Sequence, residues 1–284
     1  MIDRMLRCLV LILACFSLSL LVSATATAQG IFPDSALDSI VRQEVFSKRN
    51  NLEPLTIEDV AKISRVVGKG AKVESLEGLQ HCRALMEIDL ENNQIVDLAP
   101  LRDLKLLQKV MLAGNKIELL DPISGLEAIQ YLDVSRNRIA RLDAVRAMRN
   151  LRSIYFEENL VDSLTPLEGC KRLWSLYGSK NPIKDFSVLA SLPSVDTIHL
   201  NETGFQDLRV LTRLKQLKSL QLRGNQINDL EPLVQICKED YEGKKRFAPY
   251  LKVNIQANPL SEAGHAEQIA KIRETGVRLS VDND

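Results

Sequence analysis

Residues 85–115 read LMEIDLENNQIVDLAPLRDLKLLQKVMLAGN and contain the pattern L-x-x-L-x-L-x-x-N twice, ending at Asn93 and Asn115. The pattern recurs at a step of 22 residues. Its last position is held by Asn93, Asn115, Asn137, Asn159, Asn181, Thr203 and Asn225. A repeat of this length is one coil of a solenoid, which buries its apolar face only against neighbouring coils. We predict an α/β right-handed solenoid with a parallel sheet on its concave side, 3₁₀ or other short turns on its convex side, and helical caps.

The first half of each repeat predicts a short strand. Apolar residues alternate with polar ones, so that Ile88 and Leu90 point inward while Glu87, Asp89 and Glu91 point outward. Seven segments follow this rule: 85–90, 107–112, 129–134, 151–156, 173–178, 195–200 and 217–222.

The periodic asparagines are predicted to be structural. A buried asparagine side chain donates to and accepts from backbone groups that the coil leaves unpaired. Thr203 offers fewer such bonds, which predicts a weaker sixth coil. Asn258 is the equivalent of Asn225 at a step of 33 residues, so the last coil holds 11 extra residues.

The second half of each repeat reads I-x-D-L-x-P-L-x-x-L, as at residues 95–104. Proline fixes φ and lacks an N–H group, so it suits 3₁₀ turns or extended chain better than long helices. The prolines of this column are Pro100, Pro122, Pro166 and Pro232.

The repeats set the organisation of the chain. Residues 29–72 are predicted to be a helical N-terminal cap, with capping-box spacing from Ser35 to Asp38 and from Thr56 to Asp59. Residues 73–236 are the repeats, and residues 237–249 are an insertion, interpreted as a binding loop or as a helical extension of the convex turn. Residues 250–284 hold the last repeat and a C-terminal cap, with a helix over 261–275 and a final strand.

Residues 1–28 resemble a signal peptide. Arg4 and Arg7 precede an apolar run over 9–22, and Ala26-Thr27-Ala28 predicts cleavage after Ala28. Alternatives are a retained membrane anchor, for which the run is short, and a lipoprotein signal at Cys15. Cleavage leaves no stable membrane span and predicts a secreted, periplasmic or cell-envelope protein.

Three cysteines remain after residue 28. Cys82 and Cys170 share one apolar column and lie four coils apart, about 19 Å at the ~4.8 Å strand spacing, which is too far for a disulfide. We expect both to be buried as small apolar residues.

One face of the predicted sheet carries candidate binding residues. Tyr155, Tyr177 and His199 fall in one outward column on adjacent strands, with Tyr131 and Trp174 nearby. Aromatic residues are enriched at binding hot spots, although such a row also stiffens a sheet as a cross-strand ladder. The carboxylates of Asp89, Asp133 and Glu157 suit a basic partner or form a solvated rim. The candidate site comprises Tyr131, Tyr155, Trp174, Tyr177, His199, Asp89, Met111, Asp133 and Glu157.

Other classes of site are disfavoured. The formal net charge is zero, which argues against nucleic-acid binding. His81, His199 and His265 fall on different parts of the coils, so no metal site or hydrolase triad is predicted. Glu157 and Glu158 point apart, and no glycine-rich phosphate loop follows a strand. We predict neither an enzyme nor a cofactor.

The repeat, with the cap motifs at residues 32–60 and 258–277, resembles the 22-residue leucine-rich repeats of the bacterial internalins. It is also similar to the repeats of eukaryotic protein-phosphatase regulatory subunits. The likeness extends over residues 31–282, without the immunoglobulin-like domain and the sorting or cell-wall-binding tail of classical internalins. It implies a secreted bacterial leucine-rich-repeat protein that binds a protein partner.

The sequence leaves three functions open. The first is protein binding through the concave face. The second is glycan or cell-wall binding, with Tyr155, Trp174 and Tyr177 as sugar-stacking platforms. The third is an envelope spacer with no specific ligand.

Overall fold

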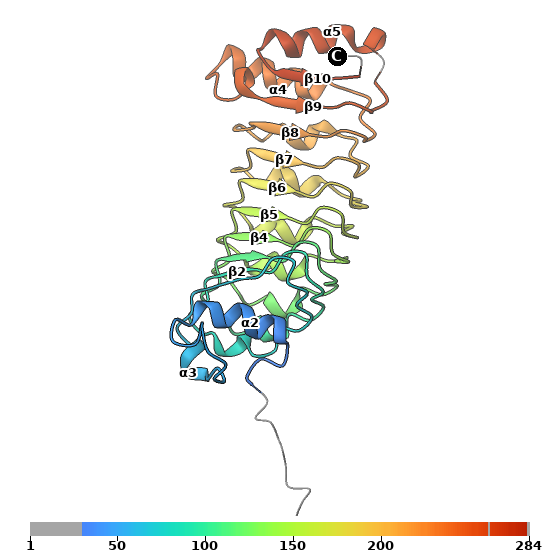
Figure 1. The fold of residues 1–284 in the computed structure, drawn as a ribbon. Helices are drawn as coiled ribbons and strands as arrows, with labels where there is room; N and C mark the ends of the chain where they lie inside the picture. The colour runs from blue at the N-terminus through green and yellow to red at the C-terminus, as the bar shows by residue number, and fades with distance from the viewer. Residues whose placement is uncertain (1–29, 261, 283–284) are drawn as a thin grey trace, which may run out of the picture. The chain divides into compact units, whose positions relative to one another are not determined.

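The computed structural model describes residues 30–260 and 262–282, in which Ile31–Asp284 form one compact unit (Figure 1). The predicted signal peptide lies outside the described residues. The core is one continuous cluster running through every coil of this unit, from Phe32 to Val281.

The described unit contains a ten-stranded parallel sheet in sequence order, which confirms the predicted sheet. The strands are β1 Arg65–Val67, β2 Glu87–Asp89, β3 Lys109–Met111, β4 Tyr131–Asp133, β5 Ser153–Tyr155, β6 Ser175–Tyr177, β7 Thr197–His199, β8 Ser219–Gln221, β9 Lys252–Asn254 and β10 Arg278–Ser280. Each is three residues long, shorter than predicted, although inter-coil hydrogen bonds continue past them, as from Leu90 N to Met111 O at 2.9 Å.

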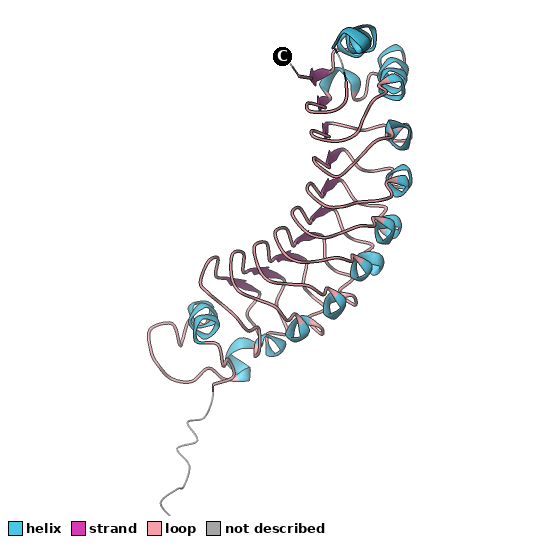
Figure 2. Cartoon of the chain, turned by 90° about the vertical axis from the view of Figure 1, so that its right-hand side faces the viewer, coloured by secondary structure: helices cyan, strands magenta, loops and turns pink. Residues whose placement is uncertain are grey.

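The opposite side of the coils between β1 and β8 is made of 3₁₀ turns, as predicted. Figure 2 shows them along the convex side of the repeats, with the strands along the concave side. They are η1 Leu79–His81, η2 Ala99–Leu101, η3 Asp121–Ile123, η4 Asp143–Ala147, η5 Thr165–Gly169, η6 Ser187–Ser191 and η7 Leu208–Leu211. Proline opens η2, η3 and η5, where its missing N–H is not required.

Two helices cover the first coil. Helix α2 spans Ser35–Glu44, and its N-cap is Asp34 rather than Ser35, because the Asp34 carboxylate accepts from Leu37 N at 3.0 Å. The same carboxylate accepts from the backbone N–H groups of Glu74 and Ser75, which ties the cap to the first coil. Helix α3, Ile57–Val60, has the predicted capping box of Thr56 and Asp59.

The insertion is a helical extension of the convex turn. Helix α4 spans Glu231–Glu242. A tight loop follows it, and the 3₁₀ turn η8, Ala248–Tyr250, then leads into β9. Helix α5, Glu262–Glu274, confirms the predicted C-terminal helix, and it ends before Gly276, whose φ is 86°. Strand β10 then closes the sheet.

The periodic asparagines form an inter-coil hydrogen-bond ladder. The asparagine Nδ2 donates to the backbone carbonyl three residues earlier and to a backbone carbonyl of the preceding coil. The asparagine Oδ1 accepts a hydrogen bond from a backbone N–H of the preceding coil. For Asn159 the partners are Phe156 O at 3.0 Å, Val134 O at 3.0 Å and Ile139 N at 2.9 Å. The ladder includes Asn258, across the insertion. All the periodic asparagines are buried.

Thr203 breaks this pattern. Its hydroxyl donates to Leu200 O at 2.9 Å, but no acceptor replaces Oδ1, and Ile183 N instead donates to Asn181 O. Asn225 compensates in part, because its Oδ1 accepts from both Thr203 N and Phe205 N. The Thr203 side chain therefore makes neither of the two hydrogen bonds to the preceding coil that each asparagine makes.

The cysteines follow the prediction. Cys82, Cys170 and Cys237 are buried and free, and burial raises the pKa of the Cys82 thiol to about 12. These thiols are therefore packing residues.

One coil departs from the apolar alternation. Gly178 occupies the inward position held by Leu90, Leu112, Leu200 and Leu222, and the ring of Phe156 on the preceding coil fills the space. A Cβ at residue 178 would lie 2.3 Å from Phe156 Cζ. The large and the small side chain therefore compensate each other across two coils.

We predict that Gly178→Ala lowers the free energy of unfolding by about 1–3 kcal/mol, because the added methyl group overpacks the core. Phe156→Leu combined with Gly178→Ala conserves volume and should restore most of that loss. Urea denaturation of the two single variants and the double variant measures the coupling. Additive losses would show that the two positions do not share space.

Candidate functional site

The strand register places the predicted outward column on the concave face. The pairs Asp89↔Met111, Met111↔Asp133, Asp133↔Tyr155, Tyr155↔Tyr177 and Tyr177↔His199 stand in one line across β2 to β7. Tyr131 lies in the adjacent column, in register with Ser153. Six parallel strands thus present the aromatic candidates and their neighbours on one surface.

Four rings form a continuous row on this surface. Tyr155 and Tyr177 are stacked, with centroids 4.3 Å apart and planes 12° apart. Tyr131 lies 5.1 Å from Tyr155, and His199 meets Tyr177 edge-on at 4.3 Å. All four side chains are partly exposed. The row therefore offers both ring faces and edges to an incoming group.

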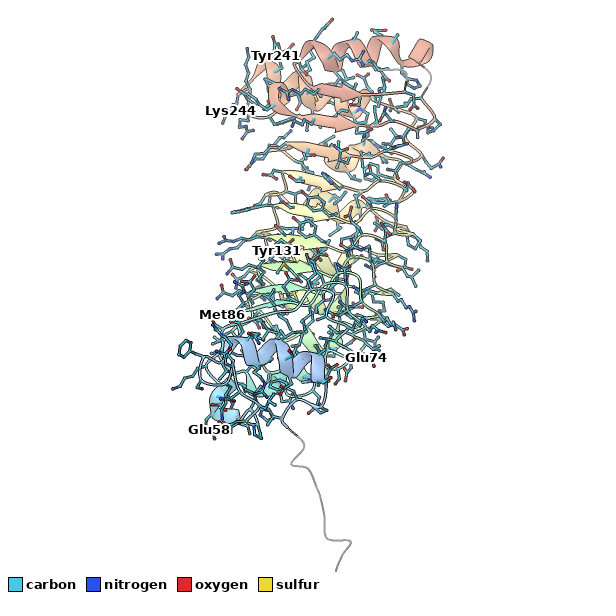
Figure 3. All side chains as sticks on the ribbon, in the orientation of Figure 1. Glu58, Glu74, Met86, Tyr131, Tyr241 and Lys244 are labelled. Carbon is cyan, nitrogen blue, oxygen red and sulfur yellow. The ribbon has the colours of Figure 1, made fainter. Side chains whose placement is uncertain are left out.

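Small side chains flank the row. Ser153 and Ser175 lie in the column on one side, and Ser135 and Ser179 in the column on the other. Glu157 stands between Ser135 and Ser179, and the tyrosine rings are the largest groups on this part of the sheet. Figure 3 labels Tyr131 among the side chains over the middle strands.

Two of the predicted site residues lie differently from the rest. Met111 is in the outward column, but only 9% of its surface is exposed. Trp174 precedes β6, and its ring contacts the Arg152 guanidinium at 5.1 Å rather than a tyrosine of the row. Trp174 is therefore outside the aromatic row.

Carboxylates adjoin the row on its N-terminal side. Burial raises the pKa of Asp133, and the charge of Glu91 adds to this rise. Burial also raises the pKa of Glu157, with Asp133 contributing in the same sense. Glu91 pairs with Lys69 at 2.6 Å, whereas no described basic side chain forms an ion pair with Asp133 or Glu157. The two carboxylates therefore have no ion-pair partner among the described residues, although the charge of Arg136 acts to lower the pKa of both.

The histidine of the row contacts a serine hydroxyl on the next strand. His199 Nε2 lies 3.2 Å from Ser219 Oγ, and burial lowers the histidine pKa, which favours the neutral ring. No described carboxylate hydrogen-bonds to it. Within the described residues no group of histidine, cysteine, aspartate or glutamate side chains is placed to hold a metal ion.

Shallow hollows occur on the turns that follow the strands. One of about 430 Å³ is lined by residues that include Ala140, Arg141 and Leu160. The tyrosine row lines none of the described hollows. It lies on an open face that is accessible to water, whereas an active site usually excludes water. The geometry suits contact with a large surface.

Solved structures with a similar fold include an internalin. Internalin C2 of Listeria monocytogenes matches with a TM-score of 0.60 and 25% identity, over 88% of this chain and 94% of that chain. The fold is internalin-like. No protein-family model matches the sequence, and no curated protein is similar to it at the sequence level.

A plant leucine-rich-repeat ectodomain has the same fold. The receptor kinase GASSHO1/SCHENGEN3 of Arabidopsis thaliana, in complex with CASPARIAN STRIP INTEGRITY FACTOR 2, matches with a TM-score of 0.55 and 16% identity over 73% of this chain. This chain spans 25% of that ectodomain. Both neighbours are consistent with the leucine-rich-repeat solenoid with helical caps that the repeat predicts.

The pKa directions give a stability prediction for Asp133. Because its native pKa is raised, the native state binds more protons than the unfolded state between the two pKa values, so stability falls as pH rises through that window. Asp133→Asn keeps an acceptor for Ser135 N, now 3.0 Å from the carboxylate. We expect this variant to be more stable than the parent at pH 7 and equal to it near pH 3.

Urea denaturation at both pH values measures this difference. Asp143→Asn is the matched control, because hydrogen bonds from Arg141 and Arg146 lower the Asp143 pKa and the substitution should give no gain at pH 7. A loss of stability for Asp133→Asn at neutral pH would contradict the assignment of an unneutralised carboxylate.

Proposed function

We propose that the protein is a binding module that captures a protein partner on the concave face of its sheet, with Tyr131, Tyr155, Tyr177 and His199 at the centre of the contact. The observation that carries the proposal is the row of four partly exposed rings, 4.3–5.1 Å apart, among small side chains. Rigid aromatic side chains bury large areas at little entropic cost and commonly act as interface anchors.

The row is not required to hold the sheet together. The same column carries Asp89 on β2, Gln221 on β8 and Asn254 on β9, and those strands pair in the same register. A ladder that only stiffened the sheet would not need to be confined to β4–β7. This confinement favours recognition over mechanical support.

Neither neighbour assigns a partner to this chain. The internalin-like fold supports a protein-binding role. The described residues include no helix long and apolar enough to cross a membrane. We place the protein outside the cytoplasm, secreted or in the cell envelope, from the predicted cleavage after Ala28, which N-terminal sequencing of exported protein tests.

A crosslinking pulldown with the chain from Gln29 onward as bait identifies the partner. Tyr155→Ala with Tyr177→Ala should then weaken binding of the purified partner by about 30-fold or more for each anchor lost. Thermal unfolding should change little, because both rings are partly exposed. Leu119→Ala with Leu160→Ala, on exposed residues away from the sheet, is the control and should bind normally.

Unchanged capture by the tyrosine variant would assign the row to sheet stiffening and would contradict the proposal. A parallel pulldown on peptidoglycan separates the glycan alternative. Retention on peptidoglycan that depends on Tyr155 and Tyr177, without capture of a protein, would replace protein binding by cell-wall binding.

A further inference from the structure

The turns that lead into the strands carry a strong excess of positive charge. They comprise residues 83–86, 105–108, 127–130, 149–152, 171–174, 193–196, 215–218 and 244–250, and we call them the leading edge. Their charged residues are eleven cations and two acids: Arg83, Lys105, Arg149, Arg152, Lys171, Arg172, Lys215, Lys218, Lys244, Lys245, Arg246, Glu127 and Asp196. The whole chain has a formal net charge of zero, so this excess is local.

Contacts between successive turns show that the leading edge is one surface. Arg172 Nη1 donates to Asn150 Oδ1 at 3.0 Å, and Asn150 Nδ2 donates to Glu127 O at 3.1 Å. Ser194 Oγ donates to Lys171 O at 3.0 Å. In Figure 3, Met86 near one end and Tyr241 and Lys244 near the other lie on the same side of the repeats.

Most of these cations have no counter-charge. Lys105, Lys215 and Lys218 form ion pairs with Asp103, Glu239 and Asp196, at 3.8, 3.7 and 2.7 Å. The other eight form no ion pair with any described acidic side chain.

The turns on the opposite side differ. Residues 92–97, 114–119, 136–141, 158–163, 180–185, 202–207 and 224–229, which we call the trailing edge, hold six Lys and Arg and eight Asp and Glu. Four of the six cations are paired: Arg138 with Glu118, Arg141 with Asp143, Lys180 with Glu158 and Lys184 with Asp162. The trailing edge is therefore a balanced surface, and it serves as an internal reference for the leading edge.

Large apolar and aromatic side chains are exposed among the unpaired cations. Trp174 is 50% exposed, Leu106 52% and Tyr250 71%, and Met86 also lies on this edge. Single exposed apolar residues are ordinary. Their combination with a row of unneutralised Lys and Arg is the pattern of a surface that lies on a bilayer, where tryptophan and tyrosine favour the headgroup region.

The insertion holds three of these cations in a fixed loop. The Asp240 carboxylate, which is mostly buried, accepts from the backbone N–H groups of Arg246, Phe247 and Ala248 at 2.9–3.1 Å. The buried Phe247 ring anchors the loop from within. The loop therefore adds Lys244, Lys245 and Arg246 to the end of the leading edge with little conformational freedom.

We propose that the leading edge docks the protein on the surface of an anionic phospholipid bilayer. Lipid phosphates supply the charge that the unpaired cations lack, at roughly 1 kcal/mol for each Lys or Arg near the surface. Nucleic acid or an acidic protein would satisfy the charge, but a bilayer also takes up the exposed Trp174, Leu106 and Tyr250. Docking by this edge leaves the neighbouring concave face open, so the proposal is independent of the partner bound there.

Vesicle co-sedimentation tests the proposal. The chain is produced from Gln29 onward, because the apolar run over 9–22 would itself bind bilayers and the described core lies entirely within the unit Ile31–Asp284. The probes are phosphatidylcholine vesicles with and without about one-third phosphatidylglycerol. We expect binding to the anionic vesicles alone, weakened as salt rises from about 50 to about 500 mM.

Two matched triple variants assign the surface. Arg149→Glu with Lys171→Glu and Arg172→Glu on the leading edge should reduce partitioning by about 100-fold or more. Arg136→Glu with Arg138→Glu and Arg141→Glu on the trailing edge makes the same change in net charge and should reduce it far less. Trp174→Ala should weaken binding, whereas Leu160→Ala, on the trailing edge, should not.

Equal losses for the two triple variants would overturn the assignment to the leading edge, as would equal binding to neutral and anionic vesicles. No vesicle binding by a parent chain with an intact thermal transition would overturn the lipid proposal outright. Retention on heparin without vesicle binding would also overturn it, and would identify the occupant as a soluble polyanion.

Discussion

The buried asparagine in each coil is the interaction on which the structure depends. A coil of this length is too thin to satisfy its own backbone groups, and the periodic side chain bonds two carbonyls and one N–H of neighbouring segments, as Asn159 does. Removing the Asn159 side chain would leave the buried Ile139 N–H unpaired, at about 1–3 kcal/mol, whereas Val134 O and Phe156 O would keep their bonds from Asn137 and Asn181. The side chain thus fixes both the turn and its distance from the previous turn.

This arrangement frees most other positions. The leucine columns and the asparagine ladder hold the coils, so the outward strand residues and the two edges can change without altering the sheet. The aromatic row occupies four strands of the concave face, and the cations occupy an adjacent edge of the same coils. A repeat unit thereby carries separate surfaces for separate partners on a common core.

Much of the fold could be predicted from the sequence, because the ladder and the apolar alternation are strictly periodic. The sheet order, the convex turns, the buried cysteines and the aromatic column all follow from the 22-residue register. Exceptions arise where side chains compensate across coils. Gly178 is filled by Phe156, and Asp34 replaces Ser35 as the cap because it also binds the first coil.

The candidate site was harder to predict, because the register gives columns but not rotamers. It placed Tyr155 beside Tyr177, and it could not show that Trp174 turns to Arg152 or that Met111 is nearly covered. The excess of cations on the leading edge was also missed. Its signal lies at the turn positions of each repeat, and it emerges only when the charges of the two edges of the folded coil are compared.

The longest coil shows where the architecture accepts change in length. Between Asn225 and Asn258 the chain makes a 33-residue circuit, yet β8 and β9 pair in the common register, and Asn258 forms the same bonds as its counterparts. The extra residues are thus accommodated on the convex side of the coil, while the strand on its concave side is unaltered. A lineage of such proteins can acquire new segments there, one coil at a time, without rebuilding the surface that faces a ligand.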